Sequence, residues 1–168
     1  MRTMGGWIAG LALGLAGCSS GNGTRGMEGD VGALDRHLAE IRTETEAHDA
    51  AISAASDLDA VADEETRHHG VLGGHTDLMN DTLEHMDTCD DGMGNPPDTG
   101  PMHDGMEQMG EEGFDHIALM GSAGNMGDAM GEEAEHQGAM DTMLDAMETM
   151  QDGMMNSAGL YDCDGGMM

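Results

Sequence analysis

The chain contains no lysine, and its few arginines all lie within the first 67 of its 168 residues. Five basic residues stand against 34 acidic ones, so the formal net charge at pH 7 is −29. Binding to nucleic acid needs a basic footprint, and this composition excludes one. Because so much negative charge also opposes compaction, we expect cations to stabilise the fold, either as bound metal or as the high salt of a salt-adapted organism.

Aromatic residues are nearly absent too, with one Trp, one Tyr and one Phe. The core must therefore be built from Ala, Leu and the 20 Met, which favour helices over strands. No stretch alternates apolar and polar residues with a period of two, so we predict an all-α fold. Met packs adaptably but specifies a unique core weakly, and we expect a modestly stable metal-free state.

One helical pattern organises the second half of the chain. Its members recur in steps of three and four, which return to one face of a helix, and they are Glu133, His136, Met140, Met143, Met147, Met150 and Met154. The same pattern occurs 68 residues upstream at Glu65, His68, Leu72, His75, Met79, Thr82 and Met86. Residues 44–86 match residues 112–154 at 11 of 43 positions. This likeness indicates a duplicated helical hairpin.

The duplication predicts a four-helix bundle of two hairpins, at residues 33–88 and 111–156. Helices are expected at about 33–55, 58–87, from 106 or 111 to 123, and 127–156, with Asp57 capping the second. Gly and Pro residues predict a loop at 89–110. Residues 18–32 are small and polar, which is typical of a flexible tether, and residues 157–168 form a tail.

The first residues combine one early Arg with an apolar run too short to span a membrane comfortably, followed by Leu15-Ala16-Gly17-Cys18. These four residues resemble the lipobox of bacterial lipoproteins. The resemblance implies a signal peptide at 1–17, lipidation of Cys18 and anchoring in the cell envelope. Because Ser19 follows, it implies the outer membrane of a two-membrane host, facing the periplasm or the exterior. An ordinary secretory signal or short anchor is the alternative.

Cys89 and Cys163 lie just beyond the second and fourth expected helices, at the same pole of an up-down-up-down bundle. An extracytoplasmic compartment is oxidising, so we predict that they form a disulfide. A thiolate metal pair is the alternative, although the Cys-x-x-Cys spacing of such sites is absent.

Each expected helix also carries one Glu and one His at a spacing of three or four residues, which puts both on the same face. Packing the hairpins together would bring these side chains to a similar height in the interior, where buried charges need partners or a metal. The predicted ligands are His48, His68, His116, His136, Glu44, Glu65, Glu112 and Glu133. The four Glu would bridge metals or orient the imidazole rings. A solvated acidic face is the alternative interpretation.

This ligand pattern resembles the carboxylate-bridged di-iron and di-manganese bundles of the ferritin-like class. The resemblance implies a two-metal site and, as one function, a di-iron oxidase or ferroxidase. His48 and His116 depart from the family's pattern and move the ligand set toward a His-rich one.

The Met residues indicate a softer ion, because thioether and imidazole together favour Cu(I) or Ag(I). In this respect the chain resembles the Met/His-rich copper- and silver-binding proteins of the bacterial periplasm. The predicted secondary ligands are His75, Met79, Met120, Met140, Met143, Met147 and Met150. Core packing and sacrificial oxidation are alternative roles for the Met residues.

These observations predict a lipid-anchored envelope protein that sequesters a transition metal, with copper favoured over iron and zinc. Its partners would be the membrane and the metal ion, with no nucleic acid. We identify no catalytic residues, since neither a nucleophile arrangement nor a phosphate-binding loop is present. Two alternatives stay open, a di-iron oxidase and a structural envelope lipoprotein without metal.

Overall fold

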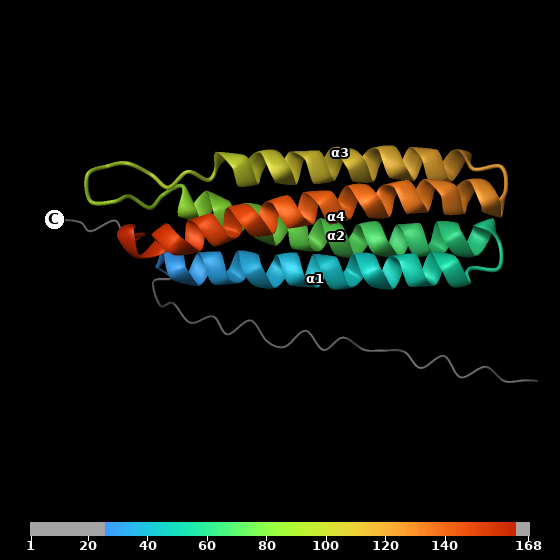
Figure 1. Cartoon of the computed structure of the whole chain (residues 1–168), viewed down its shortest axis with the longest axis horizontal. Helices are drawn as coiled ribbons and strands as arrows, with labels where there is room; N and C mark the ends of the chain where they lie inside the picture. The colour runs from blue at the N-terminus through green and yellow to red at the C-terminus, as the bar shows by residue number, and fades with distance from the viewer. Residues whose placement is uncertain (1–25, 164–168) are drawn as a thin grey trace, which may run out of the picture.

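The computed structural model describes residues 26–163 as an antiparallel bundle of four long helices (Figure 1). Helix α1 spans Met27–Ala54, α2 spans Leu58–Met86, α3 spans Gly100–Ser122 and α4 spans Met126–Ser157. A short 3-10 helix, η1, follows at Ala158–Leu160. Within residues 26–163 the only β-type pairing is an isolated bridge between Asp90 and Asp162. The predicted all-α four-helix bundle is confirmed.

The two hairpins turn at the same end of the bundle, and the α2–α3 connection lies at the other end (Figure 1). Both turns are followed by side-chain caps. Asp57 accepts a hydrogen bond from the backbone N–H of Ala60, as predicted, and Asn125 caps α4 in the same way. Helix α1 packs against α2 and α4, and α3 packs against α4. Helices α2 and α3 share the thinnest contact between neighbouring helices.

Helix α1 begins at Met27, six residues earlier than the predicted start at residue 33. Residues 27–32, expected in the tether, are therefore helical. The physical reason is burial, because Met27 and Val31 are 1% and 0% exposed in the main core. Apolar burial outweighs the low helix propensity of the neighbouring glycines.

Helix α3 begins at Gly100, earlier than the predicted start at residue 106 or 111, so residues 100–110 are helix rather than loop. Pro101 lies in its first turn, where the missing N–H costs nothing. Helix packing explains the glycine at position 105, because a Cβ there would lie only 3.1 Å from Cγ of Met147 on α4. Gly105 thus allows close packing of α3 against α4, and the glycines of α3 do not end the helix.

The buried side chains form three layers along the bundle. The main apolar core occupies the end that holds the disulfide and includes Leu34, Leu38 and Met140. A smaller apolar cluster lies toward the hairpin turns and consists of Ile52, Val61, Met120 and Ala129. The residues between them in sequence form a buried polar layer of Thr45, His48, Glu65, His68, His116, Glu133 and His136. Apolar packing on both sides therefore separates this layer from the bundle ends.

The residues that α4 buries differ in part from the predicted ones. Leu144 and Gln151 are the buried residues, whereas Met143 and Met150 are only partly buried beside the core. A straight helix has 3.6 residues per turn, whereas a strict alternation of three- and four-residue steps averages 3.5. Some predicted positions therefore lie one residue away from the buried face.

The predicted disulfide is present, with the Sγ atoms of Cys89 and Cys163 2.01 Å apart. It links the chain after α2 to the segment after η1, beside the Asp90–Asp162 bridge. The lipidation site predicted at Cys18 lies outside the described residues. Of the four described helices, none combines the length and the apolar content that crossing a membrane requires.

Replacing both cysteines, as Cys89→Ser with Cys163→Ser, should lower the free energy of unfolding by up to about 4 kcal/mol, because the bond closes a loop of 74 residues. Urea denaturation followed by circular dichroism measures the loss. The reduced wild-type protein is the matched control and should show the same stability as the double variant. Equal stability of the oxidised and reduced wild type would contradict this expectation.

Candidate metal centre

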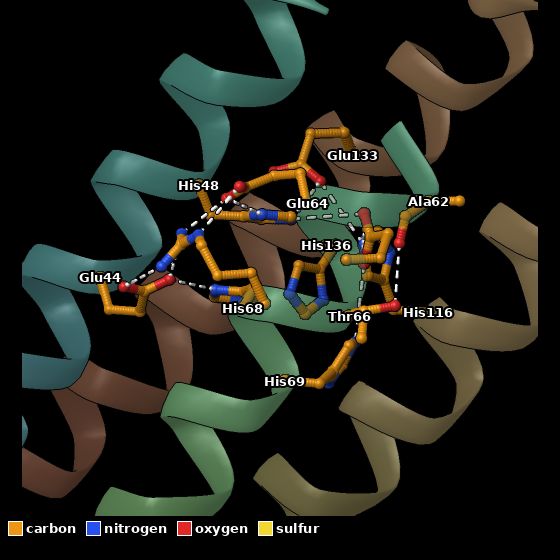
Figure 2. Close-up of polar contacts among 12 residues, drawn as sticks. Glu44, His48, Ala62, Glu64, Thr66, His68, His69, His116, Glu133 and His136 are labelled. Atoms are coloured by element: carbon orange, nitrogen blue, oxygen red, sulfur yellow. Dashed lines mark hydrogen bonds and ion pairs between the residues drawn. The ribbon is translucent and has the colours of Figure 1, made fainter. Parts of the chain in front are cut away.

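Four imidazole rings, one from each helix, meet in the buried polar layer (Figure 2). The rings of His48 and His68 stack with centroids 3.9 Å apart, and those of His116 and His136 stack at 3.8 Å. Rings from different hairpins meet edge to face, His48 with His116 at 6.2 Å and His68 with His136 at 6.1 Å. Because the duplication relates His48 to His116 and His68 to His136, the two halves of the site are structurally equivalent.

Two of the predicted carboxylates, Glu65 and Glu133, lie at the centre of this arrangement. Nε2 of His48 is 3.2 Å from Glu133 Oε2 and 3.4 Å from Glu65 Oε1. Nε2 of His116 is 3.3 Å from Glu65 Oε2 and 3.5 Å from Glu133 Oε2. We call His48, Glu65, His116 and Glu133 the central quartet. Each carboxylate contacts an imidazole from both hairpins, as a bridging ligand would.

The other two predicted carboxylates lie at the edge of the site and orient imidazole rings. Glu44 Oε1 is 3.0 Å from Nδ1 of His68, and Glu112 Oε1 is 3.2 Å from Nδ1 of His136. A carboxylate only accepts hydrogen bonds, so the proton of each neutral ring lies on Nδ1. Nε2 then keeps its lone pair, the form in which histidine binds a metal.

The imidazoles of the central quartet are held in the protonated form. Burial lowers the pKa of His48, but its ion pairs with Glu133 and Glu65 outweigh this and raise the pKa to about 10. The same opposing effects raise the pKa of His116 to about 9. Burial also raises the pKa of Glu133, but His116 and His48 lower it to about 2, and they likewise lower that of Glu65. Two imidazolium ions thus balance two carboxylates.

The remaining two imidazoles are neutral. Burial, together with the positive charge of His48, lowers the pKa of His68 to about 4 despite its contact with Glu44. Burial and the charge of His116 lower the pKa of His136 in the same way. Two neutral nitrogen donors therefore lie next to two protonated ones.

The residues fit a bound cation because several of their buried atoms lack hydrogen bonds within the described structure. These atoms are Nε2 of His48, His68 and His136, Oε2 of Glu65, and both carboxylate oxygens of Glu133. Some of these atoms form ion pairs but none forms a hydrogen bond, so part of the cost of burying them is not offset. All of these atom types are metal ligands. One donor atom from each member of the central quartet lies within 4.8 Å of the others. The arrangement can hold one ion or a carboxylate-bridged pair.

Two residues that contact the centre were not predicted from the sequence. Glu64 Oε1 lies 3.3 Å from Nδ1 of His48, and its identity with Glu132 in the duplicated segment was a signal that could have found it. The second is His69, which is partly buried, with Nε2 3.6 Å from Glu65 Oε2. Across from it, a Cβ at Gly113 of α3 would lie 3.3 Å from the His69 ring. This contact between two helices cannot be predicted from the spacing of residues within either helix.

A groove of about 530 Å³ runs between α2 and α3 and reaches the centre. It is mostly apolar, with Glu65 and His69 as its ionisable residues, and its full lining is Leu58, Val61, Ala62, Glu65, Thr66, His69, Ile117, Met120, Gly121 and Ala123. It follows the thinnest helix contact of the bundle. The groove therefore approaches the centre from this side of the bundle, at Glu65.

The predicted secondary ligands are spread along the bundle instead of surrounding one point. Met79, Met140 and Met147 are fully buried in the main core, and Met143 and Met150 pack beside it. Met120 belongs to the smaller cluster near the turns. His75 contacts His37 and Glu40 at the α1–α2 surface. Core packing accounts for the buried positions of these Met residues.

Without metal, the protein should be most stable near pH 6.5. The raised pKa values of His48 and His116 contribute stability that is complete below 6.5 and is lost as the pH rises through about 9 and 10. The lowered pKa of His68 acts in the opposite direction, since the unfolded chain takes up that proton first as the pH falls from 6.5 to about 4. Urea denaturation in the presence of a chelator, at a series of pH values, measures both effects.

The variant Glu133→Gln should flatten the alkaline decline, because it removes a carboxylate that raises both pKa values. Glu135→Gln, an exposed change of the same charge on the same helix, is the control and should keep the wild-type profile. If the two variants gave the same pH profile, the contacts of the quartet would not be the cause.

Comparison of the chain with protein-family models, curated proteins and solved structures finds no match. The resemblance to dimetal bundles and to Met/His-rich proteins is therefore limited to the types of donor residue and their spacing. The chemistry of this site is accordingly that of its own residues, a four-helix centre of four imidazoles and four carboxylates with two-fold related halves.

Proposed function

We propose that this protein binds and sequesters a transition-metal ion in the His/Glu centre between its two hairpins. The observation that carries the proposal is the convergence of buried Nε2 and carboxylate atoms within 4.8 Å of one another, most of them without a hydrogen bond. A divalent ion compensates their burial and replaces the two imidazolium protons, so the total charge of the quartet is conserved. The edge carboxylates Glu44 and Glu112 support it by orienting His68 and His136.

The donor set bears on which metal is bound. Imidazole nitrogen and carboxylate oxygen suit Zn(II), Cu(II) and Fe(II), whereas Cu(I) prefers thioether sulfur. The Met residues that favoured copper in the sequence belong to the apolar clusters on either side of the centre. We therefore propose a divalent ion at the centre, with Cu(II) the form in which copper would bind.

The cellular setting is part of the same proposal. We place the protein in the cell envelope, anchored through a lipid on Cys18, with the bundle outside the cytoplasm. The disulfide pair supports this setting because such bonds persist in oxidising compartments. A net charge of −29 also raises the local concentration of cations around the bundle.

One observation favours a second function, that of a di-iron oxidase. Glu65 and Glu133 each contact imidazoles of both hairpins, at distances of 3.2 to 3.5 Å. That position suits a carboxylate between two metal ions. Oxygen uptake on addition of Fe(II), absent with Zn(II), would select this function over sequestration.

The test of the proposal is titration of the purified metal-free protein with Zn(II), Cu(II), Cu(I) and Fe(II) by calorimetry and metal analysis. We expect a tight phase that releases about two protons per ion at pH 7, because the pKa values of His48 and His116 are about 10 and about 9. Affinity in this phase should fall about 100-fold for each pH unit below neutrality.

The double variant His48→Gln with His116→Gln should lose this phase. The matched control changes two histidines that each pair with one carboxylate outside the centre, His85→Gln and His103→Gln, and should keep it. Proton-releasing binding that survived in the His48/His116 variant would overturn the proposal. The absence of any metal binding by the wild type would leave a structural envelope protein.

The groove is the proposed path of the ion, and it can be blocked without touching a ligand. Gly121 lines the groove, and no atom lies within 4 Å of the position that a Cβ would take. The variant Gly121→Leu should therefore fold, and it should slow metal uptake without changing the stoichiometry. Gly110→Leu, on the same helix, with equal space and outside the groove lining, is the control. Stopped-flow mixing measures uptake, and equal rates in the two variants would exclude this path.

A further inference from the structure

A second cluster of potential ligands lies at the α1–α2 surface, away from the centre described above. It consists of His37 and Glu40 on α1 and His75 on α2, which we call the surface triad. His37 and Glu40 are one helical turn apart, so they lie on the same side of α1. The side chains of His37 and His75 are 12% and 21% exposed, and that of Glu40 is 48% exposed. The triad is therefore open to solvent.

We propose that the surface triad is a separate, solvent-accessible binding site for a divalent transition-metal ion of the Zn(II) class. His37 and His75 would each bind through Nδ1 and Glu40 through one carboxylate oxygen.

The distances between the three donor atoms support this assignment. Nδ1 of His37 and Nδ1 of His75 are 3.3 Å apart, and Oε2 of Glu40 is 3.2 Å from the first and 3.4 Å from the second. In a tetrahedral zinc site with bonds of about 2.0 to 2.1 Å, neighbouring donors are separated by about 3.3 to 3.4 Å. The triad thus forms three corners of such a tetrahedron, and water can take the fourth, as in zinc sites with three protein ligands.

The triad is independent of the buried centre. His37 precedes His48 by 11 residues, which is about 16 Å along a helix. Buried Ile41 and Leu72 occupy the intervening turns. The site goes beyond the proposed function, because the binding of an exchangeable ion at the surface does not require an occupied interior.

The duplication offers a matched comparison. In the second hairpin the positions of His37, Glu40 and His75 are taken by Gly105, Gln108 and Met143. The triad therefore belongs to the first hairpin alone, whereas the central ligands occur in both. Met143 is partly buried in a helix, as His75 is, so His75→Met introduces a residue that this environment accepts in the other half.

The experiment titrates the purified protein with Zn(II) and Co(II) and compares it with the variant His37→Gln with His75→Met. We expect the variant to bind one equivalent fewer and to lose the visible bands of one four-coordinate Co(II). Glu40→Gln should weaken that equivalent about tenfold or more. His103→Gln, another partly exposed histidine beside a carboxylate, should bind as the wild type does.

The outcomes separate this site from the centre. Loss of one equivalent in the triad variant supports the triad, and any proton-releasing phase of the wild type should remain unchanged in that variant. This result supports the triad even if the wild type shows no proton-releasing phase because the centre binds nothing. Equal stoichiometry in wild type and variant overturns it. If the double variant does not fold, nitrogen-15 spectra of the wild-type imidazoles decide, since Zn(II) must shift Nδ1 of His37 and His75, and unchanged Nδ1 signals overturn the proposal.

Discussion

The burial of opposite charges in one layer is the constraint on which the rest of this bundle depends. His48 and His116 lie within 3.2 to 3.5 Å of Glu65 and Glu133, with almost no exposure to water. Without each other, these groups would be costly to bury. Internal neutrality makes the layer tolerable, whereas the buried atoms without hydrogen bonds are the basis for the proposed cation site. The stability of the bundle and the proposed metal site thus depend on the same residues.

The apolar layers complete this arrangement. Met side chains fill irregular space without adding charge, and they pack between the centre and the disulfide end of the bundle. The smaller cluster closes the hairpin-turn end. The α2–α3 side is where the surface comes nearest to the centre, along the groove lined by Glu65 and His69. A site enclosed on most sides has the low dielectric that strengthens its charge interactions.

The eight Glu and His residues that meet at the centre could be found from sequence because helical spacing and the duplication act together. A Glu and a His three or four residues apart share a face, and repetition of the pair argues against chance. Their division into a central quartet and two orienting pairs could not be predicted, because Glu44 and Glu65 have the same chemistry and differ only in which helix they meet. The same limit applies to Met143 and Leu144, whose burial depends on how each helix is rotated.

The sequence by itself determined the helical class, the two hairpins, the disulfide pair and the residues able to bind a metal, since these follow from composition and from spacing along one chain. Only the tertiary structure decided which carboxylates contact both hairpins, that His69 enters the layer beside Gly113, and that His37, Glu40 and His75 converge at the surface. These features depend on distances between helices. Such distances are set by packing, for which a residue's position within its own helix carries no signal.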